Sequence, residues 1–189
     1  HIDVSRPLRK SPQLIGETIA RAALHAHRRI GTNDRLRVDA RQTFFRSPLR
    51  QPTDEQLAWA RRIEEAAQAG EAVSDRDCFF ARHMLHLDRS QTETEIEVQT
   101  IKIGEIAVVG LPCELFAEFG LDLKRRSPFN NTIVQTLAGG IHGYVCTRES
   151  FARGGYESRL TSRTRLYPDA GYEMVESALE LLGEMRTDI

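Results

Sequence analysis

The feature that most constrains the fold of this chain is an unbroken apolar run, Ile106 to Leu111, which a proline ends at once. A short run of this kind, rich in β-branched residues, predicts a central strand that is covered on both faces. The preceding segment, Thr92 to Ile103, alternates polar and apolar residues and predicts a second strand. Only Gly104 and Glu105 separate the two runs, so we expect an antiparallel hairpin.

Helical patterns alternate with the strands over the rest of the chain. Helices are predicted for residues 11–31, 53–70, 75–87, 114–126 and 171–185, and further strands for residues 35–45 and 132–137. Thr53 and Gln56 have the spacing of a capping box, and Phe79 is expected on the inward face of its helix. This order predicts an α/β fold, a mixed sheet with an antiparallel hairpin and helices packed on its faces.

Composition excludes several classes of function. The 189 residues include 26 basic and 27 acidic side chains, a balance that gives no reason to expect a nucleic-acid partner. No apolar run approaches the roughly 18 residues of a transmembrane segment. The three cysteines, Cys78, Cys113 and Cys146, form no CxxC pair, so neither a zinc finger nor a disulfide framework is expected.

Glu114 and two tyrosines are the candidate chemical groups. Glu114 follows the apolar strand closely, and open α/β sheets bind their ligands beyond the carboxyl ends of the strands. It also has the position of an ordinary first-turn acid on a helix that begins there. Tyr144 and Tyr156 lie in a glycine-rich stretch, where tyrosines usually serve packing. Cys113 is either a small residue at a tight turn or a nucleophile.

The histidines do not form a recognisable metal motif. His83 and His86 stand three residues apart on a predicted helix, a spacing that can bind metal. No HExxH-type acid accompanies them, so we interpret both as surface or rim residues. His25 and His27 are two residues apart and face different sides of their helix.

Four short motifs, taken in order, resemble the neutral/alkaline non-lysosomal ceramidase family. They are Ile103-Gly104, Leu111-Pro112-Cys113-Glu114, Gly143-Tyr144-Val145-Cys146-Thr147 and Gly155-Tyr156-Glu157. The resemblance extends from Glu97 to about Met185, with weaker similarity before it. Each motif is short, and it is their combination and order that is specific.

The resemblance implies a zinc-dependent amidase that hydrolyses the N-acyl bond of ceramide or a related lipid-like amide. Carried over by position, Glu114 and Tyr144 become zinc ligands, and Tyr156 becomes the phenol that hydrogen-bonds the reacting carbonyl. Zinc lowers the pKa of a bound water to about 7, and a phenol can donate to the oxyanion that forms. The family also implies a secreted or membrane-associated location, which this segment itself does not establish.

The chain departs from the family pattern in two ways. Cys113 replaces a glycine, which requires that the backbone there avoid positive φ. The two histidine ligands of the family have no counterpart, so residues 1–189 are predicted to be a single domain or the C-terminal half of a larger zinc-hydrolase catalytic domain, whose N-terminal half supplies them. His142, beside Gly143, is either a rim residue or a partner of a ligand. The alternative function is a non-catalytic relative that has lost the metal site.

Overall fold

The computed structural model describes residues 12–32 and 35–187, and the chain divides into two compact units, residues 1–36 and 37–189. The first unit holds helix α1 (Pro12–His27), in which no side chain is buried. Ser11, the predicted cap of this helix, lies outside the described residues.

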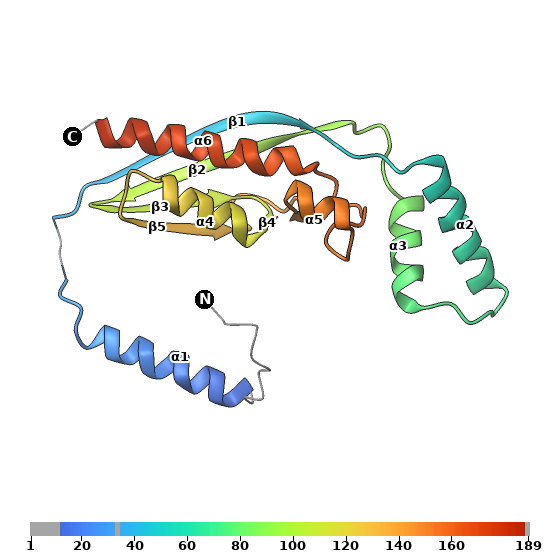
Figure 1. The fold of residues 1–189 in the computed structure, drawn as a ribbon, viewed down its shortest axis with the longest axis horizontal. Helices are drawn as coiled ribbons and strands as arrows, with labels where there is room; N and C mark the ends of the chain where they lie inside the picture. The colour runs from blue at the N-terminus through green and yellow to red at the C-terminus, as the bar shows by residue number, and fades with distance from the viewer. Residues whose placement is uncertain (1–11, 33–34, 188–189) are drawn as a thin grey trace. The chain divides into compact units, whose positions relative to one another are not determined.

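A mixed four-stranded sheet forms the centre of the second unit (Figure 1). Its strands, in spatial order, are β1 (Val38–Pro48), β2 (Glu93–Ile103), β3 (Ile106–Leu111) and β5 (Asn131–Thr136). β2 pairs antiparallel with both β1 and β3, whereas β3 and β5 are parallel. The hairpin turn contains Gly104 at φ 58°, and Ile103 lies opposite Ile106. The predicted α/β fold with a mixed sheet and an antiparallel hairpin is therefore confirmed.

Helices α4 (Ala117–Arg126) and α6 (Pro168–Thr187) cover one face of this sheet (Figure 1). Alternate residues of β3, including Ala107 and Val109, point into this layer and are fully buried. α6 fills the opposite side of the core with a row of buried residues that includes Met174, Ala178 and Leu182. The inward residues of the strands, which alternate along the chain, and those of α6, which recur at helical spacing, thus form one hydrophobic core.

The other face of the sheet is open and apolar. Ile101, Ile103, Ile106 and Ile133 occupy paired positions on this face and are 37–51% exposed. β3 is central, as predicted, but the prediction that it is covered on both faces is wrong for the residues described. A continuous apolar run indicates that both faces of the strand are suited to burial. It does not indicate whether residues of this chain cover both faces.

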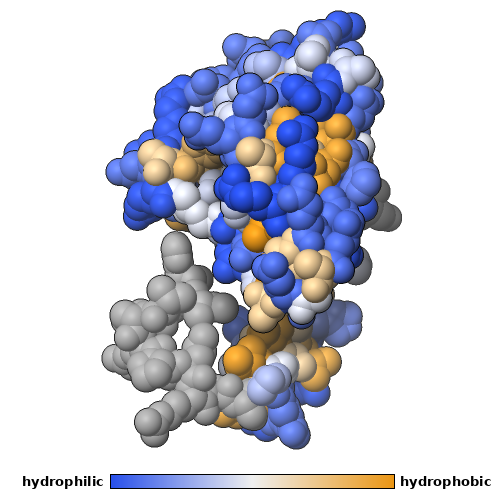
Figure 2. Space-filling model, turned by 90° about the vertical axis from the view of Figure 1, so that its right-hand side faces the viewer, coloured by the Kyte–Doolittle hydropathy of each residue, from blue (hydrophilic) through white to orange (hydrophobic). Residues whose placement is uncertain are grey.

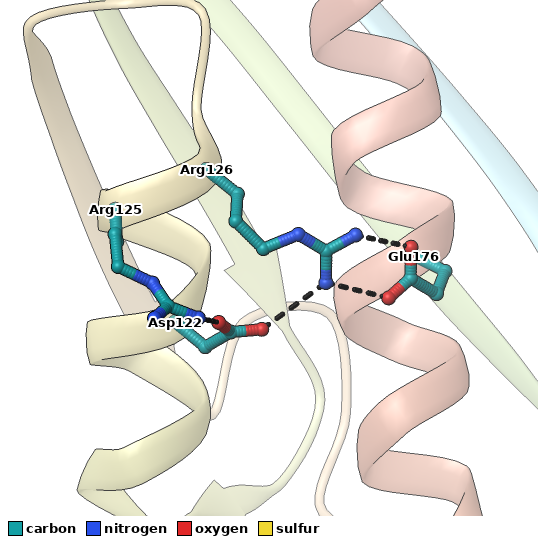
Figure 3. Close-up of polar contacts among 4 residues, drawn as sticks. All are labelled: Asp122, Arg125, Arg126 and Glu176. Atoms are coloured by element: carbon teal, nitrogen blue, oxygen red, sulfur yellow. Dashed lines mark hydrogen bonds and ion pairs between the residues drawn. The ribbon is translucent and has the colours of Figure 1, made fainter.

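An ion-pair network joins the end of α4 to α6 (Figure 3). The guanidinium of Arg126 donates to both carboxylate oxygens of Glu176, each at 2.6 Å, and to Asp122 at 3.1 Å. Asp122 also accepts from Arg125. Arg126 therefore bridges α4 and α6, although an exposed pair of this kind contributes little free energy.

Helices α2 (Asp54–Gln68) and α3 (Asp75–Leu85) form a second, smaller core. The capping box at Thr53 and Gln56 is confirmed, with reciprocal hydrogen bonds of 3.0 and 3.2 Å. Phe80 is buried, but Phe79 is 46% exposed, so its predicted inward position is wrong. Phe79 is one residue out of phase with the stripe formed by Phe80 and Met84.

The predicted end of the first strand also shifts. β1 continues past residue 45 through Ser47 and Pro48, because a proline at the end of an edge strand removes no needed donor.

The surface seen from the α2–α3 end is mostly hydrophilic, with hydrophobic residues in separate patches (Figure 2). Among the described helices, none has the length and hydrophobicity to cross a membrane.

Candidate active site

Glu114 and Tyr144 face each other across a two-stranded parallel ladder. The strands are β4 (Glu114–Leu115) and β6 (Tyr144–Val145), and the register pairs Glu114 with Tyr144 directly. The N–H of Glu114 donates to the carbonyl of Gly143 at 2.8 Å, and the N–H of Phe116 donates to that of Val145 at 3.1 Å. The prediction that a helix begins at Glu114 is therefore wrong, since these N–H groups serve the ladder and α4 begins at Ala117.

Gly143 determines the position of Tyr144. Its φ of +67° is a conformation that favours glycine, and a Cβ atom there would lie 2.5 Å from Thr164 Oγ1 and 2.8 Å from Thr164 N. Thr164 Oγ1 in turn accepts a hydrogen bond of 3.4 Å from the N–H of Tyr144. The segment around Thr164 thus packs directly against the backbone that presents the tyrosine.

One cleft of about 430 Å³ contains all three predicted site residues. Glu114, Tyr144 and Tyr156 line it together with residues of two other segments, namely Phe79, Phe80 and His83 of α3 and the stretch 161–164. Segments that are far apart in sequence therefore meet at the place where the carboxylate and the two phenols were expected.

Aromatic contacts hold Tyr156 over this cleft. Its ring centroid lies 6.0 Å from that of Tyr144 and 5.7 Å from that of Phe80, both in edge-on geometry. The guanidinium carbon of Arg76 lies 5.7 Å from the same ring. Tyr156 is nevertheless 48% exposed, so it is oriented by its neighbours and remains open to a ligand.

Glu114 controls the protonation of Tyr144. The pKa of the Tyr144 phenol is raised above its ordinary value, first by a hydrogen bond to the Glu114 side chain and then by the charge of that carboxylate. The phenol therefore keeps its proton to a higher pH than a free tyrosine does. A carboxylate and a phenol brought together in this way would form part of a donor set that suits a divalent cation.

The described residues fit half of a zinc site. Catalytic zinc requires three protein ligands and an open position, and zinc binds carboxylate oxygens readily. Within residues 12–32 and 35–187, no three His, Cys, Asp or Glu side chains gather in a way that would hold a metal ion. Glu114 and Tyr144 would thus need further ligands from elsewhere.

Cys113 is unsuited to act as a nucleophile. Its side chain is fully buried, with Sγ 3.6 Å from the sulfur of Met174. Burial, and secondarily the charge of Glu114, raises the pKa of the Cys113 thiol to about 12. Among the described non-glycine residues only Leu137 has positive φ, so cysteine is tolerated in place of the family's glycine, as predicted.

The histidines separate into different environments. His142 is half-buried next to Pro112, whose carbonyl accepts from the His142 N–H at 2.8 Å, and burial lowers the pKa of its ring. His86 is exposed, whereas His83 lines the cleft. Sequence reasoning missed Phe80 and Thr164 as parts of the site, because neither belongs to a motif and only the tertiary fold brings them there.

Comparisons with known proteins agree with this fold. No protein-family model matches the chain, and no curated protein matches it. A solved structure of neutral ceramidase from Pseudomonas aeruginosa matches at 16% identity with a TM-score of 0.52, covering 97% of this chain and 35% of that chain. A structure described as ceramidase complexed with C2 matches at 13% identity with a TM-score of 0.50, covering 81% of this chain and 31% of that chain.

These matches establish a shared fold. At such low identity they do not extend to activity, and the chain spans about a third of the length of the two solved chains, 35% and 31%. The resemblance to neutral ceramidases predicted from the sequence motifs is confirmed at the level of fold.

Proposed function

We propose that this chain is part of a zinc-dependent amidohydrolase that cleaves the N-acyl bond of ceramide or a related lipid-like amide. The observation that carries the proposal is the direct pairing of Glu114 with Tyr144 across β4 and β6, in a cleft that also contains Tyr156. The shared fold with neutral ceramidases supports it.

Each side chain has a defined role in this proposal. Glu114 and Tyr144 would hold the zinc ion, which supplies a water of pKa about 7 at the amide carbon. Tyr156 donates its phenol proton in a hydrogen bond to the carbonyl oxygen as negative charge develops there. Phe79, which is exposed and lines the cleft, provides apolar surface beside the reacting group, which suits the acyl part of a lipid-like substrate.

The remaining ligands are assigned to protein outside residues 1–189. Glu114 and Tyr144 supply two of the three ligands that a catalytic zinc needs. We propose that histidines of a preceding half of the same catalytic domain complete the site, since the chain covers only 35% of the neutral ceramidase it matches. The small-molecule amide would then bind between the two halves.

A second candidate is a non-catalytic relative of the same fold. It is favoured by one observation, that no cluster of three His, Cys, Asp or Glu ligands occurs within the part of the chain that the structure describes. The two candidates differ in metal content. A relative that has lost its metal site would bind no zinc even when the whole protein is present.

The test uses the full-length protein that contains this chain, with ceramide as the substrate. We expect fatty-acid release that a chelator abolishes and zinc restores. Tyr156→Phe should lower kcat by about 10²- to 10³-fold, the cost of one oxyanion donor. Tyr167→Phe removes a phenol at another exposed position and serves as the matched control. Hydrolysis that persists unchanged in the chelated protein would contradict the proposal.

A further inference from the structure

His83 lines the cleft, and the proposed reaction does not use it. It lies on α3, half-buried, with its ring centroid 4.4 Å from that of Phe79 in edge-on contact. Its Nδ1 atom lies 3.0 Å from Ser162 Oγ and receives the backbone N–H of Ser162 at 3.4 Å. The ring is therefore held on two sides, by an aromatic neighbour and by the Ser162 segment.

The contact with Ser162 favours one of the two neutral tautomers of the His83 ring. A backbone N–H can only donate, so Nδ1 must be the acceptor. The neutral ring then carries its single proton on Nε2. No hydrogen bond within the described parts of the chain engages Nε2, so this N–H is available to a ligand in the cleft that His83 lines.

This protonation state does not suit a zinc ligand. A histidine that binds zinc through Nε2 keeps its other proton on Nδ1, which donates to an acceptor. His83 shows the opposite arrangement, and within the described residues it forms no ion pair with Glu114. It lies in the same cleft as the proposed reaction centre without belonging to it.

We propose that His83 is a specificity-determining residue, whose Nε2–H donates a hydrogen bond to an oxygen on the amine part of the substrate. This inference rests on the proposed function. An acyl chain has no acceptor other than the reacting carbonyl, which is assigned to Tyr156. The contact would distinguish amides whose amine part carries a hydroxyl, as that of ceramide does, from amides that lack one.

Two amides of nearly equal shape test this assignment in the full-length protein. N-dodecanoylethanolamine ends in a hydroxyl where N-dodecanoylpropylamine ends in a methyl group. We expect kcat/KM to favour the hydroxyl compound about 3- to 10-fold, mainly through KM, which corresponds to one hydrogen bond. His83→Leu should abolish the preference, and His83→Gln, which keeps an N–H donor, should restore part of it.

His86→Leu, an exposed change on the same segment, is the control and should leave the preference intact. An equal preference in wild type and His83→Leu would overturn the proposal. If ceramide itself is not hydrolysed, the proposed function fails. Calorimetric binding of the same two amides then still decides the role of His83 by the same comparison. ¹⁵N NMR of the imidazole gives an independent readout, because a proton found on Nδ1 of the neutral ring would also overturn the proposal.

Discussion

At the scale of single residues, the Glu114–Tyr144 pair makes a prediction about ionisation. In metal-free protein, Glu114 raises the pKa of the Tyr144 phenol above the ordinary value of about 10. Glu114→Gln should lower that pKa towards 10, because the hydrogen-bonded carboxylate and its charge are both removed. The measurement is the ultraviolet absorbance of tyrosinate against pH, with Tyr144→Phe identifying the contribution of this residue.

Zinc should reverse the direction of this shift. A phenol bound to a cation loses its proton more easily, so the pKa of Tyr144 should fall below its metal-free value when zinc is added to the full-length protein. In the metal-free state the raised pKa means that the pair stabilises the fold fully below about pH 10 and less as pH rises through the pKa of Tyr144. An unchanged titration on zinc addition would separate Tyr144 from the metal.

The sequence predicted those cleft residues that belong to a motif, and it did not predict the others. Glu114, Tyr144 and Tyr156 were singled out from sequence and line one cleft. Phe79 was assigned to the core because it is a phenylalanine within a helix, yet its phase places it at the cleft. His83 was interpreted as a surface or rim residue, since its partner Ser162 lies 79 positions away and no local pattern reveals the contact.

At the scale of elements, the turn that precedes β6 makes a prediction about stability. Gly143→Ala should destabilise the protein by about 1–3 kcal/mol, because alanine is strained at positive φ and its Cβ would meet Thr164 at 2.5 Å. Gly70→Ala is the control, with a φ of +78° and no atom within 4 Å of the added Cβ. Both are measured by urea unfolding.

The difference between the two variants isolates the contact with Thr164. Gly70→Ala carries only the cost of positive φ, whereas Gly143→Ala adds the collision with a backbone nitrogen. Equal losses in the two variants would show that Thr164 moves aside easily and does not fix the position of Tyr144. Activity of the full-length Gly143→Ala protein should fall as well, since the same backbone presents the tyrosine.

Elements with their own local signals were predictable, and elements made by tertiary contact were not. The capping box at Thr53 and the hairpin at Gly104 follow from neighbouring residues, and the structure contains both. β4 and β6 are each two residues long. They form only when the tertiary fold brings Glu114 and Tyr144, which are distant in the sequence, into register with each other. A helix start was expected at Glu114 because an acid before an apolar stripe is the usual local signal.

At the scale of the whole molecule, the two faces of the sheet should respond differently to mutation. Ile96 and Ile101 lie on the same strand, at 0% and 39% exposure. In the 189-residue chain, Ile96→Ala should cost about 2–5 kcal/mol and Ile101→Ala less than about 1 kcal/mol. Similar losses, measured by chemical denaturation, would mean that the Ile101 face is covered after all. The sequence did not separate these faces clearly, because isoleucine occurs on both of them, at Ile96 on one and at Ile101 and Ile103 on the other.

The proposal that Glu114 and Tyr144 bind the same zinc ion is tested most directly by metal analysis of the full-length protein. We expect about one tightly bound zinc per chain in the wild type and in Tyr167→Phe, by elemental mass spectrometry after dialysis. Glu114→Ala and Tyr144→Phe should each weaken zinc binding at least about tenfold, and the double variant should hold almost none. One zinc per chain retained in the double variant would show that these two oxygens do not share a metal ion.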